Sequence, residues 1–148
     1  GEAVVKQTIP SPNMLIRRVD MNEEVYQDKD EFNQDIIVAY QKAIQAFYDA
    51  GCRYLQLDDT AWADLFSEEG HNKLRAKGLD PTEELNLMQY VINESIAKKP
   101  EDLVVTMHIC RGNYKSNYFT SGGYDFASEA IFGGLNVNGL FLEFDDER

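Results

Sequence analysis

Strand-like stretches alternate with helix-like stretches along the chain, and this alternation limits the possible folds more than any other feature of the sequence. Four short apolar stretches, residues 3–9, 53–60, 103–107 and 139–145, read as strands. Strands separated by helices favour a parallel sheet with right-handed crossovers. Pro10-Ser-Pro12 follows the first stretch, where a dinucleotide-binding turn would need glycines. The pattern therefore favours a barrel over a doubly wound sheet.

A closed eight-stranded barrel takes about 250 residues, whereas this chain has 148. The sequence therefore predicts an α/β fold that is part, about half, of a (β/α)8 TIM-type barrel with parallel strands. We expect residues 1–148 to form a single partial barrel domain of four strand-and-helix units, with the remainder of the barrel outside this chain. The start at Gly1 fits a tag remnant, a processed end or a piece of a longer protein.

Helical signals are clearest in two segments. From Asp30 onward, apolar residues recur every three or four positions until a stop signal at Gly51; they are Phe32, Ile36, Tyr40, Ile44 and Phe47. The second helix starts at residues 80–83, where Asp80 can cap the helix and Pro81 suits its first turn. Its inward stripe consists of Leu85, Met88, Ile92 and Ile96. A short third helix is expected around residues 125–132.

Three loops are expected between these elements. Residues 11–18 follow the first strand, residues 60–80 contain the single tryptophan, Trp62, and residues 111–123 are rich in turn formers and aromatic residues. Loops as long as the second one often bind ligands or act as lids. His71 lies in that loop and is expected in solvent.

Charge and composition disfavour several classes of partner. Fourteen basic and 26 acidic residues give a net charge of −12, which disfavours binding to nucleic acid or to an anionic membrane surface. No stretch approaches the roughly 20 apolar residues that span a bilayer, and no leader is visible, so we expect a cytoplasmic protein. Cys52 and Cys110 are too few for a disulfide framework, and both are expected to be reduced.

Soft metal ligands stand at the end of the third strand. His108 and Cys110 are two residues apart, so on a strand both side chains would project from one face. They would lie at the carboxyl end, where barrels place their chemistry. Neutral imidazole and thiolate are good zinc ligands. The same pair also occurs in strands that bind no metal, since cysteine is among the most buried residue types.

Acidic residues end two neighbouring strands. Asp58 lies at the end of the second strand and Glu143 in the fourth, and on a barrel such strand ends converge on one mouth. Glu143 would complete a three-ligand zinc site with one position open, or it would form a salt bridge. Asp58 would bind a substrate amine, or it would cap the next helix or close a turn.

Four motifs carry a resemblance to a known family. They are Gln7-Thr-Ile-Pro10, Leu55-Gln-Leu-Asp58, His108-Ile-Cys-Arg-Gly-Asn113 and Leu140-Phe-Leu-Glu143. Together they resemble the C-terminal catalytic barrel of the cobalamin-independent methionine synthase family, and most of all its shorter members with a single barrel. The resemblance covers most of the chain, and the His-x-Cys strand end is its most specific part.

The resemblance implies a zinc-dependent methyltransferase that moves a methyl group from a methylated folate to homocysteine or a similar thiol, in methionine biosynthesis. By position, His108, Cys110 and Glu143 match zinc ligands, and Asp58 matches the residue that holds the substrate's amino group. No catalytic acid or base is assigned. The family's fourth zinc ligand is a cysteine beyond Arg148, so we expect this chain alone to be inactive. The strand motif here is Asp58-Asp59-Thr60, where the family's larger members have an acid pair followed by proline, and this difference leaves the amino acid specificity open.

Other interpretations stay open. In one alternative, the zinc site catalyses alkyl transfer to or from another small thiol, such as a coenzyme thiol, or the cleavage of a thioether. In a second alternative, the chain is a non-catalytic fragment that forms a homo-oligomer through unpaired barrel edges. A metal-free barrel of the decarboxylase kind would leave His108 and Cys110 as packing residues. Two interpretations also stay open for Lys115 and Arg111: they bind an anionic methyl donor, or they are solvated.

Overall fold

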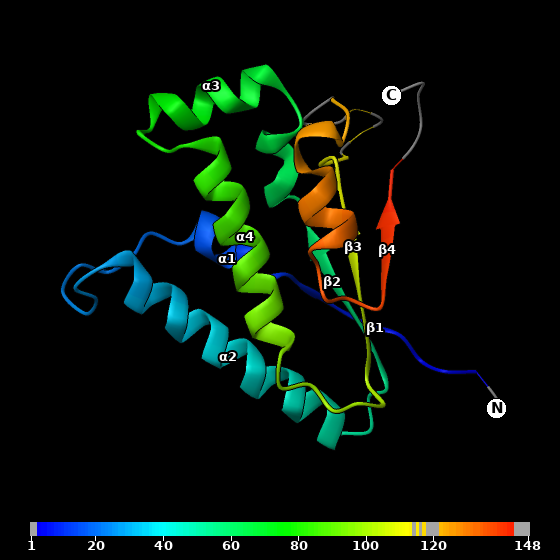
Figure 1. Ribbon diagram of the computed structural model, residues 1–148. Coiled ribbons are helices and arrows are strands. Elements are labelled where there is room, and N and C mark those ends of the chain that lie inside the picture. Colours follow the sequence, from blue (N-terminus) through cyan, green and yellow to red (C-terminus); the bar gives the residue numbers. More distant parts are fainter. Residues whose placement is uncertain (1–2, 114, 116, 118–121, 144–148) are drawn as a thin grey trace.

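Four parallel strands form the framework of the chain. The computed structural model describes residues 3–113, 115, 117 and 122–143. Within them, one sheet has the order β1-β2-β3-β4, and its strands are β1 (Gln7–Pro10), β2 (Tyr54–Asp59), β3 (Val104–Ile109) and β4 (Gly139–Leu142) (Figure 1). Every neighbouring pair is parallel. The α/β fold and the half (β/α)8 barrel predicted from the sequence are confirmed.

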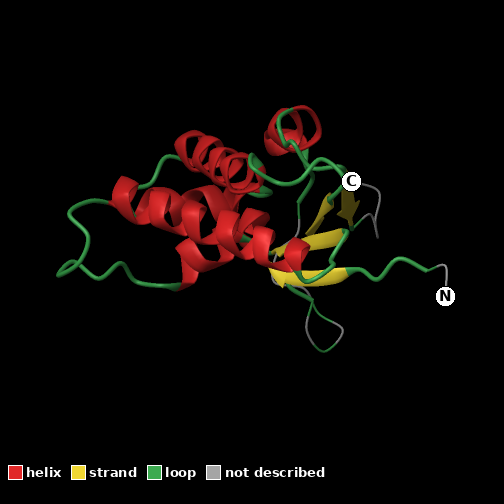
Figure 2. Ribbon diagram, turned by 90° about the horizontal axis from the view of Figure 1, so that it is seen from below, coloured by secondary structure: helices red, strands yellow, loops and turns green. Residues whose placement is uncertain are grey.

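Helices connect the strands and lie on one side of the sheet (Figure 2). The α-helices are α1 (Pro12–Arg18), α2 (Lys29–Asp49), α3 (Glu68–Ala76) and α4 (Pro81–Ile96). The described residues also form three short helices of other types. They are the 3-10 helices η1 (Ala61–Leu65) and η2 (Asp125–Ala127) and the π-helix η3 (Glu129–Gly133). None of the helices in the described part of the chain is long and apolar enough to cross a bilayer.

The hydrophobic core lies between the helices and one face of the sheet. Alternate residues of the two central strands point into it, because successive side chains of a strand point to opposite faces; they are Leu55, Leu57, Val105, Met107 and Ile109, all fully buried. From the other side, α2 contributes Ile37, Tyr40 and Ile44, and α4 contributes Met88, Val91, Ile92 and Ile96. The opposite face of the sheet, which carries Tyr54, Gln56 and Asp58, is only half-buried.

The two clearest helical predictions are confirmed at their starts, and the first also at its end. Asp28 caps α2 by accepting from the backbone N–H of Glu31 at 2.9 Å, and the chain leaves that helix through Gly51, whose φ is +98°. Asp80 caps α4 by accepting from the N–H groups of residues 82 and 83 at 2.8 and 3.1 Å. Each cap satisfies donors that the first turn leaves unpaired.

Two of the three predicted loops are wrong. Residues 12–18 form α1, because Ser11 accepts from the N–H of Met14 and Pro12 stands at the first helical position. Most of residues 60–80 fold into η1 and α3 instead of a lid. His71 is buried rather than solvated: its Nε2 lies 3.1 Å from the carbonyl oxygen of Leu65, and its ring packs against Phe126.

The outer strands are shorter than predicted. Of the first apolar stretch only residues 7–9, together with the following Pro10, pair with β2, and Val4 and Val5 before them are exposed. Pro10 ends β1, which is the edge strand where proline is tolerated. β4 ends at Leu142, and Asp145 of the predicted stretch lies outside the described residues. The predicted short helix around residues 125–132 is present as η2 and η3.

Candidate metal centre

Three of the side chains singled out in the sequence meet at the carboxyl ends of β3 and β4. His108 is the last but one residue of β3, Cys110 follows that strand and Glu143 follows β4. One possible ligand atom from each residue lies within 4.8 Å of the other two, and all three residues are half-buried. Parallel pairing produces this meeting, because His108 stands opposite Phe141 in the sheet.

The imidazole of His108 is oriented by the neighbouring strand. Its Nδ1 lies 3.1 Å from the carbonyl oxygen of Phe141, which only accepts, so Nδ1 carries the hydrogen of that bond. The lone pair of the neutral ring is then on Nε2, which faces Oε1 of Glu143 at 3.8 Å. Histidines that bind metals are typically held in this way through their other nitrogen.

Backbone and amide donors fix the other two side chains. Glu143 accepts from the N–H of Arg111 through Oε2 at 3.3 Å and from Nδ2 of Asn113 through Oε1 at 2.7 Å. Sγ of Cys110 accepts from the N–H of Gly112 at 3.2 Å. The N–H of Cys110 itself donates to the carbonyl oxygen of Asp59 at 2.8 Å, which ties the start of this loop to β2.

Asp58 lies beside the three-residue group but outside it. It is paired in register with His108 on the adjacent strand, so both side chains share the half-buried face of the sheet. Oδ1 of Asp58 accepts from Nε2 of Gln56 at 2.7 Å. The turn-closing role considered for Asp58 belongs to Asp59, whose Oδ1 accepts from the N–H of Ala61 at 2.6 Å.

Asp59 is a buried carboxylate that the sequence analysis did not single out. Its Oδ2 accepts from Ser11 Oγ at 2.6 Å, Trp62 Nε1 at 3.1 Å and Asn13 Nδ2 at 3.3 Å, in addition to the Oδ1 bond. Burial raises the pKa of Asp59, and these four donors act to lower it. The strand pattern, which places Asp59 on the same face as Leu57, was the signal that could have revealed it.

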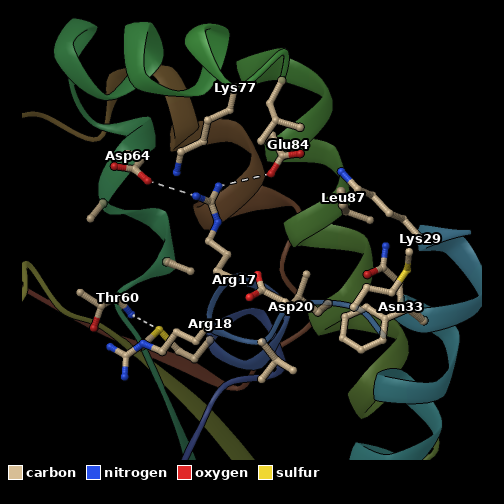
Figure 3. A pocket seen from close by; sticks show the side chains of 18 of the residues that line it. Arg17, Arg18, Asp20, Lys29, Asn33, Thr60, Asp64, Lys77, Glu84 and Leu87 are labelled. Atoms are coloured by element: carbon tan, nitrogen blue, oxygen red, sulfur yellow. Dashed lines mark hydrogen bonds and ion pairs between the residues drawn. The ribbon is translucent and has the colours of Figure 1, made fainter. Parts of the chain in front are cut away.

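A cavity of about 910 Å³ is lined mainly by residues of α1, α2, η1 and α4. Arg17 stands in its wall and forms ion pairs with Asp64 at 3.1 Å and Glu84 at 3.3 Å (Figure 3). Further cations line it, namely Arg18, Lys29 and Lys77. Gly112 and Asn113 line it too, so the loop after β3 borders both the cavity and Glu143. Nothing in the sequence analysis predicted this cavity.

Arg111 departs from the solvated alternative considered in the sequence analysis, whereas Lys115 is exposed and fits it. Arg111 is buried, with 4% of its surface exposed. Lys115 has a positive φ of 50°, which is uncommon for a residue other than glycine. Neither residue lines the cavity described above.

Half of a parallel barrel with possible metal ligands at its strand ends defines a broad class of α/β proteins, and sequence and structure comparisons narrow it. No protein-family model matches the chain. Two proteins of Bacillus subtilis, both described as uncharacterized, match its whole length: YxjG with 56% identity over 149 residues and YxjH with 51% over 148. The chain spans 39% of each.

A solved structure from Listeria monocytogenes also matches the whole chain, with 48% identity and a TM-score of 0.79, and the chain covers 41% of it. That protein is provisionally described as a vitamin-B12-independent methionine synthase. The present chain is therefore similar, from end to end, to about two fifths of such a protein.

Proposed function

We propose that this chain carries the zinc-binding part of a methyltransferase barrel, which moves a methyl group from a methylated folate to a homocysteine-like thiol in methionine biosynthesis. The observation that supports this proposal is the approach of His108, Cys110 and Glu143, whose ligand atoms lie within 4.8 Å of one another. The similarity to the Listeria protein supports the choice of reaction, although the chain spans only part of that protein.

The donor set fits zinc. Imidazole nitrogen, thiolate sulfur and carboxylate oxygen bind zinc at about 2.0–2.3 Å, which places neighbouring ligand atoms of a tetrahedron about 3.3–3.8 Å apart. For one nitrogen and one oxygen ligand the separation is about 3.3–3.5 Å, so the 3.8 Å between His108 Nε2 and Glu143 Oε1 would shorten by a few tenths of an ångström. Zinc held there would lower the pKa of a bound substrate thiol, so that the reactive thiolate persists at neutral pH.

Asp58 would orient the acceptor. Adjacent strands lie about 4.8 Å apart, and Asp58 faces the same side of the sheet as its register partner His108. A small molecule with an amino group and a thiol can therefore contact Asp58 and the metal centre at the same time. Its ammonium group would bind the carboxylate of Asp58, which is half-buried and already held by Gln56.

The cavity lined in part by Gly112 and Asn113 is the proposed place of the methyl donor. It borders Asn113, which contacts Glu143, and it is large enough for a molecule of drug size. Lys29 and Lys77 would attract an anionic group on that donor, in a chain whose net charge is otherwise strongly negative.

The experiment that tests this function is a zinc titration against a competing chelator, with and without homocysteine. We expect one zinc per chain, bound more tightly when homocysteine is present because the thiol occupies the open position. Replacing homocysteine with a coenzyme-type thiol that has no amino group separates the two kinds of acceptor. A chain that binds no zinc in any of these conditions would contradict the proposal.

A second candidate is a self-associating half barrel without activity of its own. Among the described strands, β1 and β4 each pair on one side only, and Val104 and Phe141 on the half-buried face are 40% and 43% exposed. We propose that residues 1–148 form one domain, and that β4 of one copy pairs with β1 of another to close a barrel of eight strands. The mass in solution tests this: a dimer is expected, and a monomer at all concentrations would contradict it.

A further inference from the structure

The loop that follows β3 contacts two of the three proposed ligands at once. Within four residues, Cys110 offers its thiol, Arg111 donates its N–H to Glu143, Gly112 donates its N–H to Cys110, and Asn113 donates its side-chain amide to Glu143. Gly112 has a φ of +76°, a conformation that other residues rarely adopt. That turn brings the side chain of Asn113 back over the strand ends.

We propose that Asn113 is a positioning residue, which holds the carboxylate of Glu143 against His108 and Cys110 before the metal arrives. This inference rests on the proposed metal centre. The bond from Asn113 Nδ2 to Glu143 Oε1 is 2.7 Å long, shorter than the 3.3 Å bond from the N–H of Arg111. Oε1 is also the oxygen that faces Nε2 of His108.

The position of Glu143 explains why it needs such a partner. It follows the last residue of β4, which is an edge strand among the described residues, so only one neighbouring strand confines it. Its side chain is 19% exposed, and without a donor it is free to turn toward water. Holding one rotamer of a glutamate costs conformational entropy, and a bond to Asn113 offsets part of that cost in advance.

An amide suits this task better than a charged side chain. Lysine or arginine at position 113 would neutralise Glu143 and compete with a cation for it. Aspartate would repel Glu143 at the same distance. Asparagine orients the carboxylate and leaves its full negative charge available, as the hydrogen-bonding partners of metal-binding carboxylates generally do.

The test is a double-mutant cycle on zinc affinity. The variants are Asn113→Ala, Glu143→Ala and the combination, with Asn136→Ala as a matched control, because Asn136 is an exposed asparagine that lies just before β4, away from the strand ends. Zinc dissociation constants come from chelator competition, and the absorption spectrum of bound Co²⁺ reports the ligand set. Unfolding of the metal-free chain checks the fold of each variant.

We expect Asn113→Ala to weaken zinc binding about 10- to 100-fold and to leave the unfolding midpoint of the metal-free chain unchanged. In the Glu143→Ala background the same change should have no further effect, because Asn113 acts only through Glu143. If Glu143→Ala or Asn113→Ala does not fold, Glu143→Gln and Asn113→Ser replace them, since each keeps a polar side chain.

Three results would overturn the inference. Unchanged zinc affinity in Asn113→Ala would remove the positioning role and leave the metal centre intact. An equal loss in both backgrounds would show that Asn113 does not act through Glu143. A wild-type chain that binds neither zinc nor Co²⁺ would refute the metal centre itself, and the positioning role with it.

Discussion

Nε2 of His108 lies 3.8 Å from Oε1 of Glu143, although the two residues end different strands. The distance depends on sheet register, because His108 is paired with Phe141 and its Nδ1 donates to the carbonyl oxygen of that same residue. A single strand pairing thus fixes the ring of one proposed ligand and the backbone position of another. The geometry of the site therefore depends directly on the register between β3 and β4.

Cys110→Ser should lower zinc affinity on the order of 100-fold or more, because a neutral hydroxyl replaces the thiolate that soft metals prefer. Cys52→Ser is the matched control, since Cys52 is also half-buried but lies before β2, where its thiol contacts the carbonyl oxygen of Tyr54. Metal content after dialysis measures both. Full zinc retention in Cys110→Ser would contradict the assignment of this ligand.

Asp58→Asn should leave zinc affinity in the absence of thiol unchanged and weaken homocysteine binding about 10- to 100-fold. A hydrogen bond to a charged group contributes about 1.5–3 kcal/mol, and the asparagine lacks the charge that would hold the amino group. A thiol without an amino group should bind the variant and the wild type equally well. Isothermal titration with both thiols measures the difference, and equal weakening for the two would rule out the proposed role.

Tyr40→Phe should destabilise the chain by about 0.5–1.5 kcal/mol near neutral pH, because the hydroxyl of Tyr40 donates to the carbonyl oxygen of Pro10 at 2.8 Å. Burial raises the pKa of Tyr40 to about 12, helped by the nearby charge of Asp59. The folded chain therefore favours the neutral phenol.

The advantage of tyrosine should be fully present below pH 10 and fall as the pH rises toward 12, since only the unfolded chain loses the proton easily in this range. Urea unfolding at several pH values measures the difference, and Tyr90→Phe serves as the control because Tyr90 is exposed. A difference that stays constant up to pH 12 would contradict the raised pKa.

Asp59→Asn should change how stability depends on pH in the acid range. Burial raises the pKa of Asp59 in the folded chain, so the folded state holds this proton more tightly than the unfolded state does. Relative to the variant, the wild type should be most stable below pH 3.8 and should lose that advantage as the pH rises through the raised pKa. Chemical unfolding of both proteins between pH 3 and 7 measures this. A wild-type advantage that grows with pH would mean that the four donors outweigh burial.

Local sequence signals predicted the framework well. Period-two alternation placed Leu55 and Leu57 on one face of β2, and cap residues such as Asp80 marked helix starts, because these features depend on nearest neighbours in the chain. The same logic gathered His108, Cys110 and Glu143, since parallel strands end at a common edge. Whether they bind a metal stays a prediction.

Features that depend on distant segments escaped prediction. Burial of His71 requires Phe126 to pack against it from a later part of the chain. The surroundings of Asp59 draw on Ser11 and Trp62, from both sides of the sequence. The helix α1 was an exception: the serine cap and proline start were visible in the sequence, and the prediction of a loop there was simply wrong.

Asp58 and Asp59 are neighbours in sequence with opposite surroundings: one faces the half-buried side of the sheet and the other receives four donors in the core. A slip of β2 by one residue would exchange them and would bury Asp58 where the donors are aligned for its neighbour. The two aspartates therefore make a one-residue slip of β2 unfavourable, since it would leave a buried carboxylate without its aligned donors. Ser11 and Trp62 both donate to Oδ2 of Asp59, so these two bonds across the edge of the barrel exist only in the observed register.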